Sequence, residues 1–203
     1  EYLGSGNVGA HSNDVFHANN IMYAAVDKMN EGLCTVDVSD PSTPVQLDCV
    51  DVDGKGLTVA VSGNYAYVGT NDSRNGLAVV DMSEPKNLEL ETTLDLDGEV
   101  NDLVIDAGYL YAAVDDRNKG LTVVDLSDPD DPIIASTRHL YNDEGLAVTL
   151  GGNYAYLTND DAEVVSFDIS NPNAPVRLAY EGINNNGLAI TYKESYLYVA
   201  VAS

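Results

Sequence analysis

The chain has 203 residues, of which 44% are hydrophobic, so it is long enough for one domain with a sizeable core. It carries 33 Asp and Glu against 9 Lys and Arg, a formal net charge of −24 at pH 7. This charge excludes a general nucleic-acid binder and a binder of anionic membranes, and it favours a cation or a basic protein as partner. No apolar run is long enough for a membrane span.

Two sequence markers recur with a period of about 44 residues. The first is Gly-Leu-x-x-Val-Asp-x-Ser-x-Pro, at residues 32–41, 76–85 and 120–129, with a weaker copy at 163–172. The second is a tyrosine followed by small or apolar residues. It occurs at Tyr23, Tyr67, Tyr111, Tyr156 and Tyr198. Because both markers keep one period along the whole chain, the sequence predicts a repeat protein.

The second period shows which elements one repeat contains. Its apolar and β-branched residues predict four short strands, at residues 57–62, 65–70, 77–82 and 89–95, with turn residues between them. No window has the 3.6-residue apolar period of a helix. Four strands in a repeat of this length are typical of a β-propeller blade.

We therefore predict an all-β protein, a β-propeller of four-stranded blades, in one domain over residues 1–203. Four near-complete blades are predicted, with partial blades at both ends. The predicted blades are residues 12–52, 56–96, 100–141 and 145–182, and a partial blade at 187–203. Residues 1–8 align with the fourth strand of a further blade.

An open arc of blades would expose a strand edge, so we expect the chain to be part of a longer polypeptide with about six to eight blades. Two alternatives stay open. One is a five-bladed ring with an incomplete blade, and the other is closure of the arc by a partner chain.

The first predicted blade contains both cysteines, Cys34 in its third strand and Cys49 in its fourth. An antiparallel pairing that sets Val38 opposite Val45 also sets Cys34 opposite Cys49. This geometry allows a cross-strand disulfide, which would indicate an oxidising compartment. Two small buried thiols are the alternative.

Asp14 and Asp102 occupy equivalent positions at the start of the first strand of the first and third blades. Near the channel of a propeller, their carboxylates would bind a ligand or an ion, or they would accept backbone hydrogen bonds from a neighbouring blade. Another aspartate stands at the sixth position of the first marker in every blade, and this repetition favours a structural role in turns. These repeated aspartates are Asp37, Asp81, Asp125 and Asp168.

Acidic residues gather in the loops between the second and third strands of the blades. Because neighbouring strands run in opposite directions, these loops share one face of a propeller with the connections between blades, such as Asp143-Glu144. We predict that this face binds a cation or a basic partner. Besides Asp14 and Asp102, the predicted binding residues are Asp72, Asp115, Asp116, Asp160 and Asp161.

Calcium is the specific cation that this face suggests, since Ca²⁺ prefers several closely spaced oxygen ligands. Asp115, Asp116 and Asn118 form an oxygen-rich loop, which lacks the glutamate of an EF-hand loop. The alternative is that Asp and Asn stabilise turns in this loop. No other cofactor is expected.

Residues 120–132, Gly-Leu-Thr-Val-Val-Asp-Leu-Ser-Asp-Pro-Asp-Asp-Pro, resemble the LVIVD repeat of bacterial and archaeal surface proteins, as does the phrase at 108–114 before them. The resemblance covers nearly the whole chain, but the fourth unit lacks the Gly-Leu opening at residues 163–164. The resemblance implies an extracellular β-propeller, often one module of a longer secreted or anchored protein. It implies no particular activity.

The three histidines, His11, His17 and His139, stand at no repeated position, and no common hydrolase or metalloprotease motif is present. His17 aligns with apolar strand positions, so we expect it to be partly buried. An enzyme is therefore not predicted. A propeller lyase or hydrolase is the enzymatic alternative, and it would use a channel cluster for which Asp14, Asp102 and His11 are the candidates.

The sequence thus predicts a non-enzymatic, secreted or cell-surface β-propeller that acts as a structural or protein-binding module through its acidic face. Its partner is expected to be another protein or other chains of an assembly. A calcium-binding adhesion or filament-decorating module is a second hypothesis, and the propeller enzyme is a third. The loops differ between blades, as a binding face requires.

Overall fold

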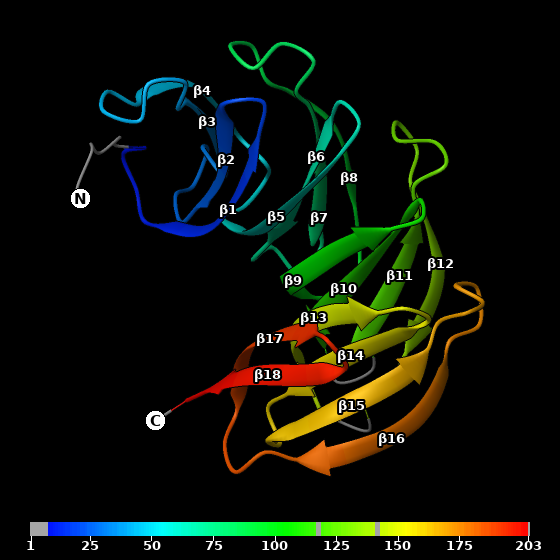
Figure 1. Ribbon diagram of the computed structural model, residues 1–203. Helices are drawn as coiled ribbons and strands as arrows, with labels where there is room; N and C mark the ends of the chain where they lie inside the picture. The colour runs from blue at the N-terminus through cyan, green and yellow to red at the C-terminus, as the bar shows by residue number, and fades with distance from the viewer. Residues whose placement is uncertain (1–7, 117–118, 141–142, 203) are drawn as a thin grey trace. The chain divides into compact units, whose positions relative to one another are not determined.

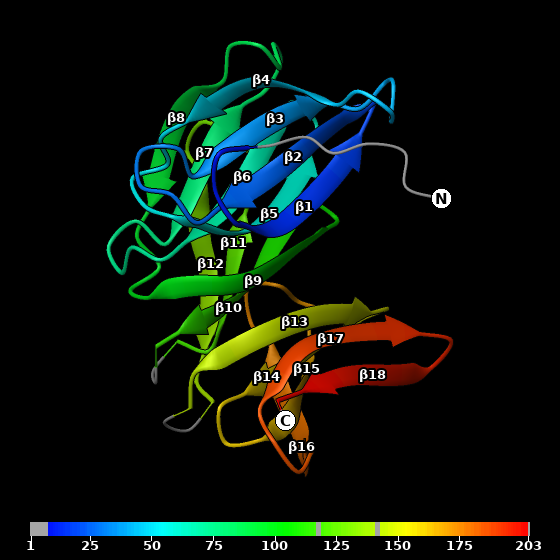
Figure 2. The same ribbon diagram turned by 90° about the vertical axis from the view of Figure 1, so that its left-hand side faces the viewer.

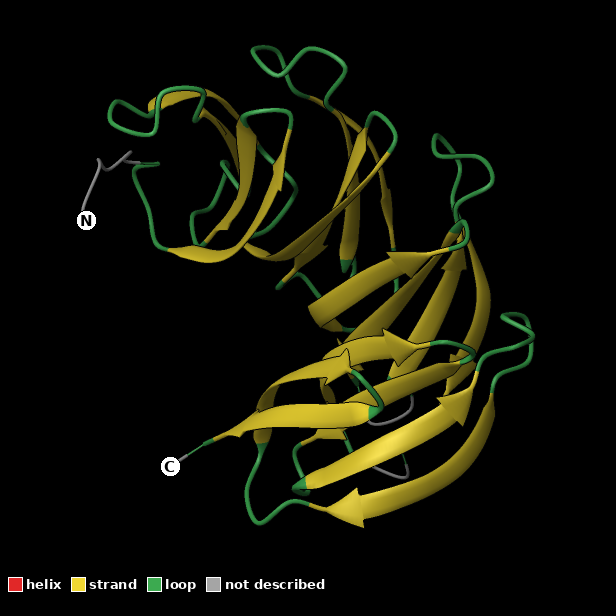
Figure 3. Cartoon of the chain, viewed as in Figure 1, coloured by secondary structure: helices red, strands yellow, loops and turns green. Residues whose placement is uncertain are grey.

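The computed structural model describes residues 8–116, 119–140 and 143–202. These residues form strands β1 to β18 and contain no helix (Figure 3), which confirms the all-β prediction. Accordingly, the described part of the chain has no helix long and apolar enough to cross a membrane. The chain divides into two compact units, Glu1–Asp95 and Leu96–Ser203.

The first unit holds two antiparallel four-stranded sheets (Figure 1). One sheet consists of β1 (Ser12–Ala18), β2 (Ile21–Val26), β3 (Leu33–Asp37) and β4 (Val45–Val50). The other consists of β5 (Gly56–Ser62), β6 (Tyr65–Thr70), β7 (Leu77–Asp81) and β8 (Glu89–Leu94). The four strands predicted for the second repeat lie within one residue of β5 to β8.

The second unit holds two more sheets of the same kind and a strand pair. Its first sheet consists of β9 (Glu99–Asp106), β10 (Tyr109–Asp115), β11 (Leu121–Asp125) and β12 (Ile133–Arg138). Its second sheet consists of β13 (Gly145–Gly151), β14 (Tyr154–Asn159), β15 (Glu163–Asp168) and β16 (Val176–Gly182). The pair β17 (Gly187–Lys193) and β18 (Tyr196–Val201) packs beside β13 (Figures 1 and 2).

In every four-stranded sheet, each strand pairs with the next one along the chain. This meander is the topology of a propeller blade, so the four sheets are blades in series. Residues 1–7, where the sequence predicts most of a further strand, lie outside the described residues. The partial fifth blade at 187–203 contains two strands, β17 and β18.

The core of each unit lies between neighbouring blades. Side chains alternate between the two faces of a strand, and the apolar ones on facing sheets pack together. In the first unit, Tyr23 and Leu33 are buried in a cluster with Val68 of the next blade. In the second unit, Tyr111 and Phe167 share such a cluster. The recurring tyrosine therefore serves blade-to-blade packing at these two places.

His17 is exposed, contrary to the expectation that it is partly buried. The cause is the two-residue alternation along β1, in which Phe16 and Ala18 turn toward the core of the unit and His17 turns away from it.

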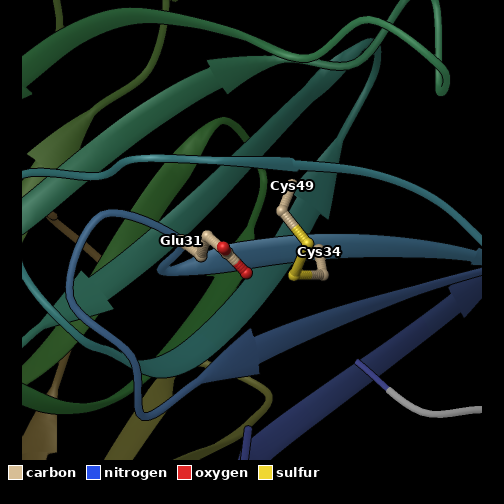
Figure 4. Close-up of side chains that lie close together, drawn as sticks. All are labelled: Glu31, Cys34 and Cys49. Carbon is tan, nitrogen blue, oxygen red and sulfur yellow. A yellow bond between two sulfur atoms is a disulfide. The ribbon is translucent and has the colours of Figure 1, made fainter. Parts of the chain in front are cut away.

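Cys34 and Cys49 are joined by a disulfide that links β3 to β4 (Figure 4). The two cysteines are opposite each other, but the partner of Val45 is Asp37 and not Val38. The reason is a β-bulge in β4, which has one residue more than β3 between the two ends of the hairpin. The predicted register is therefore right at the cysteines and wrong at the turn.

Candidate functional site

Four polar side chains come together on the blade β13–β16. Asp143 lies in the connection before β13, Asn159 ends β14, Asp161 lies in the next loop, and Glu163 begins β15. We call these four residues the Asp143 cluster. The short loop between β14 and β15 brings the last three together, because antiparallel pairing sets the end of one strand beside the start of the next.

Asn159 holds the cluster in place. Its side chain is fully buried, and its Oδ1 accepts a hydrogen bond from the backbone N–H of Glu163 at 2.8 Å. Its amide Nδ2 donates to Asp143 Oδ2 at 3.1 Å and to Glu163 Oε2 at 3.2 Å. One buried amide therefore fixes two carboxylates from different segments.

The environment of Asp143 disfavours its charged form. Its relative exposure is 9%, and burial raises the pKa of Asp143 to about 6. The hydrogen bond with Asp161 and the negative charges of Asp161, Asp160 and Glu163 act in the same direction. At neutral pH the site thus concentrates negative charge where water screens it poorly, which favours the approach of a cation.

A cavity of about 750 Å³ opens beside the cluster. Its lining includes acidic side chains and consecutive residues of β16, among them an arginine whose guanidinium lies 5.3 Å from the ring centroid of Tyr180. The lining residues are Leu140, Asp143, Asp161, Glu163, Arg177, Leu178, Ala179 and Tyr180. The cavity therefore offers carboxylates, one guanidinium, and apolar and aromatic surface.

A second group of acids adjoins the cluster. Burial raises the pKa of Asp115, and the charges of Glu99, Asp160 and Asp116 raise it further. Asp160 acts on both Asp115 and Asp143, so it connects the two groups. It also accepts a hydrogen bond from the backbone N–H of Glu144 at 3.0 Å. We define the acidic face of the second unit by Glu99, Asp115, Asp116, Glu144, Asp160 and the Asp143 cluster.

The structure thus brings together four of the predicted binding residues, Asp115, Asp116, Asp160 and Asp161. Asp72 belongs to the other unit, where its Oδ1 accepts hydrogen bonds from the backbone N–H groups of Arg74 and Asn75 and stabilises a turn. Asn118, the third predicted calcium ligand, lies outside the described residues.

Asp14 and Asp102 connect neighbouring blades. Asp14 Oδ2 accepts hydrogen bonds from Val59 N at 2.9 Å and from Thr58 Oγ1 at 3.1 Å, both on β5. Asp102 Oδ2 accepts one from Val148 N on β13 at 2.8 Å. In the described structure these carboxylates are therefore used as acceptors between blades, which is one of the two roles that the sequence left open.

We expect Asp102→Ala to lower the free energy of unfolding of the second unit by about 1–2 kcal/mol, because the part-buried N–H of Val148 loses its acceptor. Urea unfolding is the measurement. Asp106→Ala, at an exposed position of the same strand, is the control and should change stability by less than about 0.5 kcal/mol. Equal effects of the two substitutions would contradict the assigned role.

The repeated aspartates after the third strand of each blade form turns. Asp37, Asp81, Asp125 and Asp168 each accept a hydrogen bond from the backbone N–H of a serine two residues later, at 2.7 to 2.9 Å. The hydroxyl and the N–H of Ser39 lower the pKa of Asp37, and Ser170 does the same for Asp168. These carboxylates complete Asx turns, as their repetition indicates.

One group of three potential metal ligands occurs within the described residues. It consists of Glu31, Cys34 and Cys49, whose ligand atoms lie within 4.8 Å of one another (Figure 4). Both sulfur atoms belong to the disulfide, so neither is a thiolate that could bind a metal. Glu31 instead forms an ion pair with Lys28 at 2.7 Å. We therefore do not assign a metal site there.

Comparison with known families gives matches to one repeat. Residues 13–52, 53–95, 97–138 and 146–181 each match the LVIVD repeat. The chain belongs to the LVIVD repeat family. No curated protein matches the chain.

Solved structures resemble this LVIVD protein in fold. A periplasmic gluconolactonase from Pseudomonas aeruginosa, PpgL, is 12% identical with a TM-score of 0.79, over 94% of this chain and 63% of that one. A protein from Lactobacillus plantarum is 17% identical with a TM-score of 0.77, over 93% and 63%. The computationally designed protein Ika8 is 14% identical with a TM-score of 0.73, over 92% and 54%. The LVIVD chain thus spans about half to two thirds of these chains, and the likeness concerns the propeller fold.

The fourth LVIVD repeat differs from the others at the Asp143 cluster. Asp143 stands where the second and third repeats have Gly54 and Gly98. A Cβ atom added at Gly54 would meet Thr70 and Asp72. One added at Gly98 would meet Val114 and Asp116. Those neighbours correspond to Asn159 and Asp161. Where these two repeats have a glycine against close neighbours, the fourth repeat therefore has a carboxylate among polar partners.

Glu163 stands where the first three LVIVD repeats have glycine. A Cβ atom at Gly32 would lie 2.0 Å from Val52 Cγ2, and one at Gly120 would lie 2.4 Å from Leu140 Cγ, so apolar packing requires glycine there. In the fourth repeat, Ile183 takes the place of Val52 and is only half-buried. The polar cluster thus replaces a packed apolar contact of the repeat.

Sequence reasoning missed Asp143, Asn159 and Glu163 as site residues, and Arg177 and Tyr180 with them. The signal was present in the missing Gly-Leu opening of the fourth repeat, together with an acid at the glycine position of the preceding connection. These departures are spread over 20 residues of sequence, and only the folded blade brings them to one cavity.

Proposed function

We propose that this LVIVD protein is a non-enzymatic module, displayed at the cell surface or secreted, that binds a basic protein partner through the acidic face of its second unit. The observation that carries the proposal is the Asp143 cluster. It gathers three carboxylates at a cavity, and two of them, Asp143 and Glu163, stand at positions where other repeats have glycine.

Two further features support the proposal. The disulfide between Cys34 and Cys49 is typical of proteins in an oxidising compartment, which agrees with a location outside the cytosol. Asp14 and Asp102, two of the three candidates for a catalytic channel cluster, accept hydrogen bonds between blades and are thereby used structurally. Both features are consistent with a surface-exposed binding protein.

The test is fluorescence anisotropy with labelled decalysine and decaglutamate as probes. We expect decalysine to bind and decaglutamate not to bind. The affinity for decalysine should fall steeply between about 50 and about 300 mM salt. The triple variant Asp143→Asn, Asp161→Asn, Glu163→Gln should bind about tenfold more weakly, since three charges contribute roughly 0.5 kcal/mol each.

The matched control removes three exposed acids elsewhere, by Glu84→Gln, Glu91→Gln and Asp131→Asn. It should lose less than about twofold, because only the overall charge changes. Equal losses in the two triple variants would contradict a specific site. Displacement of decalysine by Ca²⁺ but not by Mg²⁺ would favour the calcium-binding alternative instead.

A further inference from the structure

The outer strand of the fourth blade has an unusual surface. β16 is the end strand of its sheet, and no further strand pairs with it among the described residues (Figure 1). Its large apolar side chains are mostly exposed: Val176 by 58%, Leu178 by 53% and Tyr180 by 62%. End strands are normally protected from pairing with other chains by charges or short length.

The corresponding strand of the second blade shows the usual protection. In β8, Glu91 and Thr93 occupy the places that Leu178 and Tyr180 occupy in β16, as the pairing of each strand with its neighbour shows. The exposed leucine and tyrosine of β16 are therefore absent from β8, whereas an exposed apolar residue at the place of Val176 recurs in the first and third blades as Val45 and Ile133.

The exposed edge and the acidic cluster share one cavity. Residues 177–180 of β16 line it together with Asp143, Asp161 and Glu163. An extended peptide that pairs with β16 would thus have its backbone along the strand and alternate side chains directed to the carboxylates. The apolar surface of an end strand and negative charge thus lie within reach of one short segment.

We infer that β16 binds an extended, basic peptide segment of the partner, which adds a strand to the sheet and places a lysine or arginine side chain in the cavity. This inference rests on the proposed function and names its ligand. Charge complementarity selects the occupant, because the cavity has three carboxylates against one guanidinium, that of Arg177, and the chain has a net charge of −24. Backbone pairing supplies affinity, and the alternate side chains supply specificity.

The probes are a peptide of alternating lysine and valine and the same peptide with its alternate amides N-methylated. Methylation removes the backbone donors and leaves the charge unchanged. We expect the unmethylated peptide to bind at least about tenfold more tightly. It should also slow hydrogen exchange of the amides of residues 176–182 more than that of β12.

Two variants of β16 copy the edge of β8, which the fold accepts. Leu178→Glu with Tyr180→Thr, and Tyr180→Thr alone, should each weaken binding of the alternating peptide at least about fivefold. The first variant adds a negative charge, so a purely electrostatic site would bind the basic peptide more tightly instead. Ile133→Thr, at an exposed apolar position of β12, is the matched control and should leave binding unchanged.

The outcomes separate the two proposals. Equal binding of both peptides, or unchanged binding by the β16 variants, would overturn the strand-addition inference while decalysine binding still supports the acidic face. A chain that binds neither decalysine nor the alternating peptide would overturn the proposed function and this inference with it.

Discussion

Removing the Cys34–Cys49 disulfide is expected to lower the free energy of unfolding of the first unit by about 3 kcal/mol. The bond closes a loop of 15 residues between β3 and β4, and a loop of this length loses roughly that much conformational entropy in the unfolded chain when it is cross-linked. Cys34 is fully buried, so its replacement must also preserve packing. Urea unfolding with and without a thiol reductant is the measurement.

The second blade supplies the matched variant. Ala78 and Thr93 are paired there as Cys34 and Cys49 are in the first blade, so Cys34→Ala with Cys49→Thr copies a pair that the fold accepts. This variant should be as stable as the reduced protein and should not respond to reductant. Hydrogen exchange in β9 to β18 should stay unchanged, because the bond lies in the other unit. Wild-type stability that is the same with and without reductant would contradict the prediction.

Asp143→Asn is expected to stabilise the second unit by about 2–3 kcal/mol at pH 7.5 and to have little effect at pH 4. An aspartate in the unfolded chain has a pKa of 3.8, and in the folded protein the pKa of Asp143 is raised to about 6. Between these values the folded state holds a proton that the unfolded state has lost, so stability falls as pH rises through this window. Above pH 6 the whole penalty is present, and a neutral amide avoids it.

Urea unfolding of the variant and the wild type at both pH values measures this effect. Asp131→Asn, an exposed position, is the control and should change stability by less than about 0.5 kcal/mol at either pH. Equal stability of Asp143→Asn and the wild type at pH 7.5 would show that the carboxylate is not destabilising. A residue that lowers stability yet occupies a cavity is typical of a binding site.

The strands and blades could be predicted from the sequence because each is specified by local patterns that recur. The positions of β5 to β8 follow from alternating apolar residues and turn residues within one period, and the other repeats supply independent copies of the same pattern. The exception is the register of β3 and β4. There the bulge changes the partner of Val45 without leaving a mark in the composition of either strand.

The acidic face could be predicted only in outline. Asp115, Asp116, Asp160 and Asp161 were selected because their loops share one face, and loop position follows from strand order. What distinguishes Asp143 from the chain's other acids is burial and a hydrogen bond from Asn159, 16 residues away. Both depend on how the segments of the fourth blade come together in space, and the spacing of residues along the chain does not contain that information. Tyr180 and Arg177 join the site for the same reason.

The bond that Asp14 makes with the next blade has a consequence for how such a protein can change in length. Asp14 bonds to β5, Asp102 bonds to β13, and the blade after each of them has no carboxylate at that position, since Thr58 and Ala147 stand there. Among the four complete blades, the first and third thus have a carboxylate at this position and the second and fourth do not. Loss of the second blade alone would set Asp14 against Asp102, two carboxylates where a hydroxyl now donates, and they would repel each other.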